Sequence, residues 1–208
     1  MNEDATLTKH DLVLASTSPR RADILKRLGV SFLIVFVEID ESHSRGETPC
    51  NYVRRLALRK AEIAASMEYQ PRTPVLAADT TVVIDGFILG KPSGLEQARE
   101  MLSRLSGRWH DVYSGLAMMQ ESSKTISVRT RVKFRSIKAA EIGRYWDTGE
   151  PRDKAGAYGI QGLGGAFVEK IDGSYSNVVG LPMAETIVLL EKYKVGHLLR
   201  PKITAPRS

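Results

Sequence analysis

Short apolar runs alternate with amphipathic helical segments along this chain, and this alternation restricts the fold more than any other feature. The runs 12–15, 32–37 and 75–78 have the length of buried strands. Between them, segments 19–28 and 52–67 carry apolar residues at helical spacing. Strands separated by helices in this way form sheets whose faces are covered by the helices. The first part of the chain therefore predicts a helix-covered sheet.

Hairpin signals add antiparallel strands to this sheet. Asp85 and Gly86 stand between two short apolar runs, and Asp-Gly in that setting is a strong hairpin signal. Segments 112–119 and 125–136 predict long antiparallel strands. The remaining expected elements are helices at 95–105, 138–146 and 182–193 and a strand at 166–171. We therefore expect a mixed α/β fold, in which helices flank a mixed β-sheet.

Composition excludes several classes of protein. The 208 residues suffice for one large domain or two small lobes, and no apolar run approaches the roughly 18 residues of a membrane span. The polar segment Met1 to Lys9 does not resemble a secretory signal, and the single Cys50 precludes an internal disulfide. We expect a cytoplasmic protein without a membrane partner. Its formal net charge of +6 suits a small anionic substrate.

The stretch LASTSPRR joins the first strand to the first helix. Ser18 stands at the N-cap and Pro19 at the first helical position. Arg20 and Arg21 follow in the first turn, where the helix dipole disfavours cations. A bound phosphate would neutralise both arginines, with the Ser16 hydroxyl and free backbone N–H groups as further donors. On this stretch alone, a capped helix with solvent-facing arginines is the alternative.

Carboxylates follow the other strands. Asp79 follows the third apolar run, so we expect it at the C-terminal edge of the sheet, where α/β proteins bind ligands. An Asx-turn is the alternative for that segment. Glu38, Asp40 and Glu41 follow the second strand. If that strand is parallel to its neighbours, Asp40 emerges at the same edge as Asp79.

Lys60, Lys91 and Lys154 stand in comparable positions on the other segments. Each lysine alone is typical of a solvated surface charge. Two carboxylates and several cations at one edge of a sheet are the composition of a metal-assisted phosphoryl-transfer site. The chain has no Cys/His cluster with zinc spacing and no Gly-x-Ser-x-Gly motif, and GFILGKP has one residue too few between its glycines for a P-loop.

Arg129, Arg131, Lys133 and Arg135 alternate with smaller or apolar residues along one expected strand. This pattern favours a half-buried strand with its charged face in water. A groove for a phosphate backbone is the alternative. It is less favoured because the segment lacks the interleaved aromatic residues of a base-stacking surface. We therefore expect no stable nucleic-acid partner.

Six segments together resemble the Maf family of nucleoside triphosphate pyrophosphatases: LASTSPRR, LALRKAEIA, AADTTVV, LGKP, MLSRLSGR and GEPRDKAGAYGIQGLGGAFVEKIDGSYSNVVGLP. The resemblance implies two lobes with a deep cleft between them, a fold related to that of the inosine triphosphate pyrophosphatases. It implies hydrolysis of a nucleoside triphosphate to the monophosphate and pyrophosphate, a divalent metal (Mg or Mn) and a homodimer. The segments ADT and DKAGAYGIQG resemble the branch that acts on dTTP and UTP.

The same resemblance divides the chain into three parts. Residues 1–11 form an N-terminal extension, 12–193 a single domain of two lobes, and 194–208 a basic C-terminal tail. The tail lies outside the resemblance, and we expect it to be a frayed end.

Roles follow from the resemblance residue by residue. Asp79 is implied as the catalytic acid group that accepts a proton from water, and Asp40 as a residue that helps Asp79 with the metal. Gln161 has both a donor and an acceptor, which suit the O4 and N3–H edge of thymine or uracil. The implied base-selecting residues are Arg20, Thr80 and Gln161, and the implied phosphate-binding residues are Ser16, Arg21, Lys60 and Lys91.

Two alternatives remain beside hydrolysis of dTTP, UTP and modified pyrimidine nucleotides. One is a regulator of cell division that binds nucleotide or nucleic acid without turnover. The other is the same chemistry on a different base, such as 7-methyl-GTP. A pure binder has little need for a carboxylate among phosphate ligands, which favours an enzyme.

Overall fold

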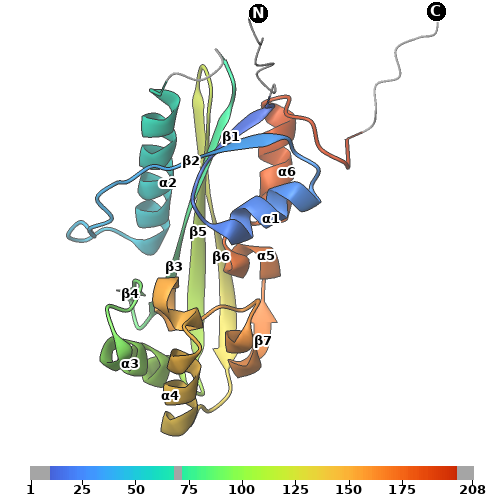
Figure 1. The fold of residues 1–208 in the computed structure, drawn as a ribbon. Coiled ribbons are helices and arrows are strands. Elements are labelled where there is room, and N and C mark those ends of the chain that lie inside the picture. The colour runs from blue at the N-terminus through green and yellow to red at the C-terminus, as the bar shows by residue number, and fades with distance from the viewer. Residues whose placement is uncertain (1–9, 68–71, 201–208) are drawn as a thin grey trace, which may run out of the picture.

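One seven-stranded sheet organises the computed structural model, which describes residues 10–67 and 72–200 (Figure 1). Its strands are β1 (Leu12–Ala15), β2 (Phe32–Val35), β3 (Val75–Ile84), β4 (Phe87–Leu89), β5 (Trp109–Met119), β6 (Ser123–Phe134) and β7 (Val168–Asp172). They follow the order β2-β1-β3-β5-β6-β7, and β4 pairs with β3. β1 is parallel to β2 and β3, whereas the other pairings are antiparallel. The expected mixed α/β fold is confirmed.

Helices cover both faces of this sheet. They are α1 (Pro19–Arg27), α2 (Pro49–Ala65), α3 (Leu95–Leu105), α4 (Ala139–Asp147), α5 (Tyr175–Val179) and α6 (Met183–Lys192), with 3-10 turns at Glu150–Asp153, Ala155–Ala157 and Leu163–Phe167. The sequence predicted all of the α-helices except α5, which has only five residues. Within the described ranges, no helix is both long enough and apolar enough to cross a membrane.

Two lobes share the long strands β3, β5 and β6 (Figure 1). In the upper lobe of Figure 1, α1 and α6 pack on one side of the sheet around Leu14, Leu25 and Leu190, and the alanine-rich side of α2 packs on the other. In the lower lobe, α3 and α4 enclose a separate core around Leu102 and Phe134. The strands β3, β5 and β6 therefore run without a break from one lobe to the other.

β3 differs most from its prediction, because it continues past Ala78 to Ile84. β5 pairs with it along nearly this whole length, which supports its backbone on one side. On the other side, β1 pairs only as far as Ala77 and β4 only from Val82. The prediction that Asp79 follows a strand was wrong, as was the Asx-turn alternative. Asp79 lies within β3, beside the gap between β1 and β4.

Turn and cap chemistry explains the other element ends. Asp85 and Gly86 have φ of 52° and 78°, as a two-residue hairpin turn requires, so the predicted β3–β4 hairpin is confirmed. α2 begins at Pro49, three residues before its prediction, because the Thr48 hydroxyl accepts the N–H of Asn51 and caps the helix. β2, in contrast, is two residues shorter than expected.

The C-terminal segment 194–200 packs against the end of α1. The backbone N–H of Leu198 donates to the carbonyl of Leu28 at 2.8 Å, and Val195 and His197 are buried. A Cβ at Gly29 would overlap the Leu198 side chain. The prediction of a frayed end was therefore wrong for these residues, because apolar contacts and a backbone hydrogen bond hold them. Residues 201–208 and the extension 1–9 lie outside the described residues.

Candidate active site

A cleft of about 630 Å³ lies between the two lobes. The end of β1, the first turn of α1 and the segment after β2 line one side, and the loop after β4 and residues 153–161 line the other. Asp79 and Thr80 of β3 lie between them. Eight residues expected at the site line this cleft: Ser16, Arg20, Arg21, Lys60, Asp79, Thr80, Lys91 and Gln161.

Arg21 reaches from α1 across to β3. Its Nη1 donates to Ser16 Oγ at 3.1 Å, its Nη2 to Thr80 Oγ1 at 3.1 Å and its Nε to the carbonyl of Gly180 at 2.9 Å. These acceptors are neutral, and within the described part of the chain no carboxylate pairs with Arg21. Burial lowers the pKa of Arg21, but a guanidinium remains charged in proteins. Its charge is therefore available to an anionic ligand.

The first turn of α1 keeps free backbone donors beside Arg21. Ser18 is the N-cap residue, as predicted, but its side chain makes no cap hydrogen bond. Its backbone N–H instead donates to Ser16 Oγ at 3.2 Å, at the end of β1. A helix N-terminus with such groups attracts anions. The solvent-facing alternative fails for Arg21, whereas Arg20 has a partly exposed side chain 3.8 Å from Asp153.

Asp79 and Lys60 form the charged centre of the cleft. Lys60 Nζ donates to Asp79 Oδ1 at 2.7 Å, and both side chains are about one-tenth exposed. Burial raises the pKa of Asp79, and the charges of Lys60 and Arg21 oppose that rise. A buried carboxylate with a raised pKa is better suited to accept a proton than an ordinary surface aspartate.

Gly115 allows the helix that carries Lys60 to lie close to the sheet. Gly115 pairs with Asp79 across β3 and β5, and a Cβ at Gly115 would overlap the backbone carbonyl of Val53 in α2. Lys60 follows Val53 by two helical turns, so it extends from the same side of α2. This close packing accounts for the short contact between Lys60 and Asp79.

Glu41, which the sequence analysis left without a role, is the second carboxylate on Lys60. Lys60 Nζ donates to Glu41 Oε1 at 2.8 Å. Burial disfavours the Glu41 carboxylate, but the hydrogen bond from Lys60 and the nearby charges of Lys60, Lys91 and Arg21 outweigh this, so its pKa is lowered. Tyr52 donates its hydroxyl to the backbone carbonyl of Glu41 at 2.8 Å and so holds this segment against α2.

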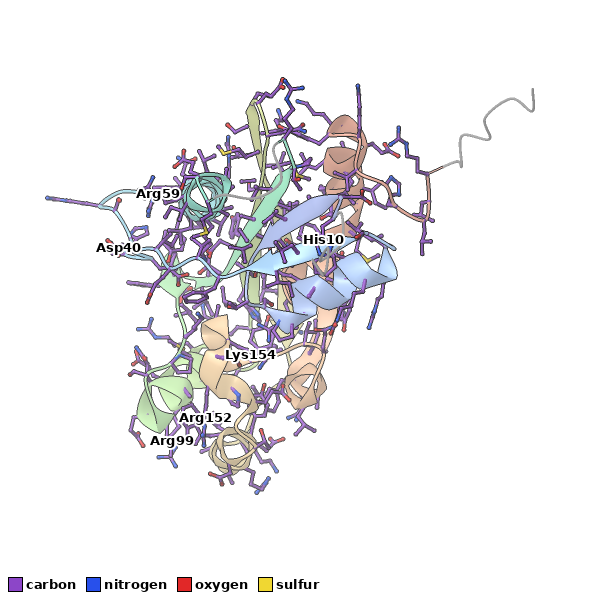
Figure 2. The ribbon with its side chains drawn as sticks, turned by 45° about the horizontal axis from the view of Figure 1, so that its top comes forward. His10, Asp40, Arg59, Arg99, Arg152 and Lys154 are labelled. Carbon is purple, nitrogen blue, oxygen red and sulfur yellow. The ribbon has the colours of Figure 1, made fainter. Side chains whose placement is uncertain are left out.

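Asp40 does not line the cleft. Its carboxylate accepts the backbone N–H and the hydroxyl of Ser42, at 2.8 and 2.9 Å, and its side chain is exposed on the segment between β2 and α2. In Figure 2, Asp40 lies at the outer side of the molecule, whereas Lys154 lies nearer its middle. Of the neighbouring acidic residues, the structure thus brings Glu41 to Lys60 and leaves Asp40 outside. Only the cluster Glu38, Asp40 and Glu41 was visible in the sequence.

Thr80 is fixed from several sides. Its hydroxyl accepts from Arg21 and lies 2.8 Å from Ser114 Oγ, which in turn donates to the carbonyl of Asn177. Asn177 belongs to α5, the short helix that the sequence did not predict, and Gly180 ends that helix with φ of 118°. α5 therefore positions both Thr80 and Arg21.

The lower side of the cleft presents Lys91 and Gln161. Both are exposed, and within the described residues Lys91 makes no ion pair. Lys154, in contrast, is held by its own segment: its Nζ donates to the Glu150 carbonyl and to Asp153 Oδ1, both at 2.7 Å. Lys91 is therefore free to meet a ligand, while Lys154 is largely engaged.

The cleft residues fit a divalent cation only together with a ligand. No group of three or more His, Cys, Asp or Glu side chains within residues 10–67 and 72–200 is arranged to hold a metal. Asp79 and Glu41 do share Lys60, so two carboxylates are present in one place. One or two carboxylates plus substrate phosphates are the usual ligands of Mg²⁺. The donor set thus suits a metal that arrives with a phosphorylated substrate.

A family model described as Maf-like protein matches residues 11–193. The chain belongs to the Maf family. Two Maf relatives are named dTTP/UTP pyrophosphatase. One, from Hahella chejuensis, is 49% identical over 194 residues, which cover 92% of this chain and 96% of the relative. The other, from Myxococcus xanthus, is 51% identical over 192 residues, which cover 92% and 95%. The family resemblance of the sequence motifs is confirmed.

Two solved structures match parts of this Maf chain weakly. A nucleoside-triphosphatase, or dITP/XTP pyrophosphatase, from Mycobacterium abscessus matches with a TM-score of 0.38 and 17% identity, over 59% of this chain and 72% of its own. The Ham1 protein of Staphylococcus aureus matches with a TM-score of 0.41 and 15% identity, over 59% and 71%. A likeness at this level carries no functional conclusion.

Proposed function

We propose that this protein is a nucleoside triphosphate pyrophosphatase that hydrolyses dTTP and UTP to the monophosphate and pyrophosphate. The observation that carries the proposal is the buried Asp79–Lys60 pair beside Arg21, whose charge has only neutral acceptors. A buried carboxylate next to a guanidinium that hydrogen-bonds only to neutral acceptors suits a reaction in which water attacks a phosphate. The names of the Maf relatives supply the substrates.

Phosphate oxygens would bind at the first turn of α1 and at the free cations. Arg21 offers a planar fork of donors, and the first turn of α1 lines the same cleft. Lys91 approaches from the lower lobe as a point charge. A triphosphate carries several negative charges, so holding it between the lobes neutralises these cations and orders the reacting phosphorus.

Asp79 would accept the proton of the attacking water. Its raised pKa favours this role, and Lys60 stabilises the ionised carboxylate until the proton arrives. Asp79 and Glu41 are the carboxylates that would hold a divalent cation such as Mg²⁺ or Mn²⁺. When bound, such a cation supplies charge neutralisation to phosphate oxygens and lowers the pKa of a bound water. Asp40 stays a prediction as a metal residue, and its contacts do not support that role.

Gln161 would recognise the base from the lower side of the cleft. Its amide can donate to O4 and accept from N3–H of thymine or uracil. The 5-methyl group that distinguishes the two bases is worth only about 1–3 kcal/mol in a pocket, so acceptance of both is expected. Thr80 and Arg20 remain predictions for base choice, because Thr80 already contacts Arg21 and Ser114, and Arg20 lies near Asp153.

A panel of nucleoside triphosphates with pyrophosphate detection tests the proposal. We expect pyrophosphate release from dTTP and UTP, dependent on Mg²⁺ or Mn²⁺, and slower release from purine nucleotides. Preference for 7-methyl-GTP would contradict the base assignment but keep the chemistry. Tight nucleotide binding without pyrophosphate release would instead favour the regulator.

The proposal includes a homodimer in the cytoplasm. Light scattering coupled to gel filtration measures the mass of the purified chain, which is 23.0 kDa for one copy. We expect twice that mass, and a monomer at assay concentration would remove the dimer from the proposal without affecting the chemistry.

A further inference from the structure

Gln161 lies in a glycine-rich loop, residues 159–164, that wraps around one carboxylate. Glu150, which precedes this loop, accepts the backbone N–H of Leu163 on Oε2 at 2.8 Å and that of Gly164 on Oε1 at 3.1 Å. Oε1 also accepts the hydroxyl of Tyr145 at 2.8 Å. One side chain thus binds the far end of the loop by two backbone hydrogen bonds.

Tyr145 extends this network to the near end of the loop. Its hydroxyl accepts the backbone N–H of Gly159 at 3.1 Å while it donates to Glu150. The Glu150 carboxylate is therefore linked to backbone groups on both sides of Gln161. Within the loop, the N–H of Gly162 donates to the carbonyl of Gly159 at 3.2 Å and closes the turn.

The glycines of the loop have a steric reason to be there. A Cβ at Gly162 would overlap the Glu150 carboxylate, and a Cβ at Gly164 would lie 2.5 Å from the Tyr145 hydroxyl. At Gly159, a Cβ would lie 2.7 Å from Cε of Lys154. The backbone can lie this close to the three side chains because glycine has no Cβ.

Charge and backbone contacts favour an ionised Glu150. Burial disfavours its charged form, but the N–H of Gly164, the hydroxyl of Tyr145 and the N–H of Leu163 outweigh this, so its pKa is lowered. All three groups are donors, and only a carboxylate can accept from all of them at once. The backbone carbonyl of Glu150 also accepts from Lys154.

We propose that Glu150 is a positioning residue for base selection: it holds the loop that presents Gln161 and so fixes where the amide of Gln161 meets the base. The inference rests on the proposed function, because it concerns how that nucleotide site tells bases apart. Glu150 itself does not line the cleft, so it acts through the loop and not by touching substrate.

The central test replaces Glu150 by Gln and measures kcat and KM for dTTP, UTP, dCTP and dGTP. The amide places an NH₂ donor against backbone N–H groups and leaves one of them unpaired. We expect a rise in KM for dTTP of roughly 10-fold or more, with a small change in kcat, and a fall of similar size in the preference for dTTP over dCTP. Loss of rate that is equal for all four nucleotides would overturn the inference.

Glu141→Gln is the matched control. Glu141 is also in the lower lobe and also accepts a backbone N–H, that of Lys138 at 2.9 Å, together with Arg135. It lies at the start of α4, and within the described residues none of its hydrogen bonds reaches the loop 159–164. Its replacement should change stability alone. If Glu141→Gln altered base preference as much as Glu150→Gln, the effect would be general loosening of the lobe, and the assignment to Glu150 would be wrong.

Gly162→Ala provides a second route if Glu150→Gln folds poorly. It keeps the carboxylate but pushes it from the loop, so it should reproduce the loss of base preference. Circular dichroism and thermal melting report whether each variant is folded. Folded Glu150→Gln or Gly162→Ala protein with wild-type base preference refutes the positioning role alone. A wild-type protein inactive on every nucleotide refutes the proposed function and this inference with it.

Discussion

Arg21 in the cleft and Arg129 on β6 carry the same guanidinium in opposite surroundings. Arg129 makes two hydrogen bonds to Asp111, at 2.8 and 2.9 Å, on the exposed face of the sheet. Arg21 is buried more deeply, yet its three acceptors are uncharged. A guanidinium that is already hydrogen-bonded to a carboxylate has few donors left for a ligand, whereas a guanidinium with only uncharged acceptors can still pair with an anionic ligand.

The other basic residues of this segment are paired with carboxylates in the same way. In β6, Arg131 lies 3.9 Å from Asp172 and Lys133 lies 3.2 Å from Glu169, and Arg135, directly after β6, lies 2.8 Å from Glu141. The alternate residues Thr130, Val132 and Phe134 are buried. The prediction of a half-buried strand with a charged outer face is confirmed. The neighbours of a basic residue, and not the count of such residues, separate a binding site from a solvated surface.

Asp79→Asn should have the largest effect. It removes the proton acceptor and should lower kcat on dTTP by about 10²–10⁴-fold, with nucleotide binding retained. Pyrophosphate release and isothermal titration measure the two quantities, and circular dichroism checks folding. Retention of most of the activity would show that another group accepts the proton.

Arg21→Lys against Arg129→Lys tests the comparison directly. Lysine keeps the charge but loses the planar fork, so Arg21→Lys should reduce kcat/KM by about 10–100-fold, whereas Arg129→Lys should leave kcat/KM within about twofold. Steady-state kinetics with dTTP measures kcat/KM for the two variants and for the wild-type protein. Equal effects of the two substitutions would mean that the guanidinium of Arg21, with its neutral acceptors, has no special role.

Sequence reasoning located most of this site because local chemistry is visible in sequence. Ser18 at the N-cap position, Pro19 after it and Arg21 in the first helical turn are local signals that the structure bears out, although the Ser18 side chain makes no cap hydrogen bond. Asp85 and Gly86 signalled their hairpin in the same way. For these residues, neighbours in the chain determine the conformation.

Other features depend on contacts between distant segments, which a single sequence does not reveal. β3 continues through Asp79 because β5 pairs beside it and Lys60 offsets its charge. The choice of Glu41 over Asp40 depends on a hydrogen bond from Tyr52 to the backbone. Residues 194–200 are ordered by the end of α1 and not by their own composition.

The inner face of the β5–β6 pair should respond to acid at a higher pH than the start of α4 does. His110 pairs with Val132 in register and is buried against Phe134 and Tyr158. Burial lowers the pKa of His110 to about 4. Between pH 6.5 and 4 the unfolded chain binds a proton that the folded protein does not, so stability falls as the pH falls through this range.

For His110 this linkage amounts to roughly 2 kcal/mol between pH 7 and pH 5. Urea unfolding at the two pH values measures it, and His110→Phe should lack this part of the pH dependence. In the first turn of α4, hydrogen bonding to Arg135 lowers the pKa of Glu141 to about 2, so Glu141→Gln should change the pH dependence only below pH 4.5. An identical slope in wild type and His110→Phe would contradict the linkage.

The smallest effects are expected on the outer face of β6. Arg131→Gln and Lys133→Gln should each change the free energy of unfolding by less than about 1 kcal/mol, because exposed ion pairs contribute little, and dTTP turnover should stay at the wild-type level. Urea unfolding measures the free energy of unfolding, and pyrophosphate release measures the turnover of dTTP.

The same pair of variants, Arg131→Gln and Lys133→Gln, tests the nucleic-acid alternative. Because Asp172 and Glu169 already accompany these cations, we expect no salt-dependent DNA binding by the wild-type protein that the substitutions could remove. DNA affinity that falls steeply with salt and disappears in the two variants would show that the strand's charges are available after all, and would turn the contrast between Arg21 and β6 into a likeness.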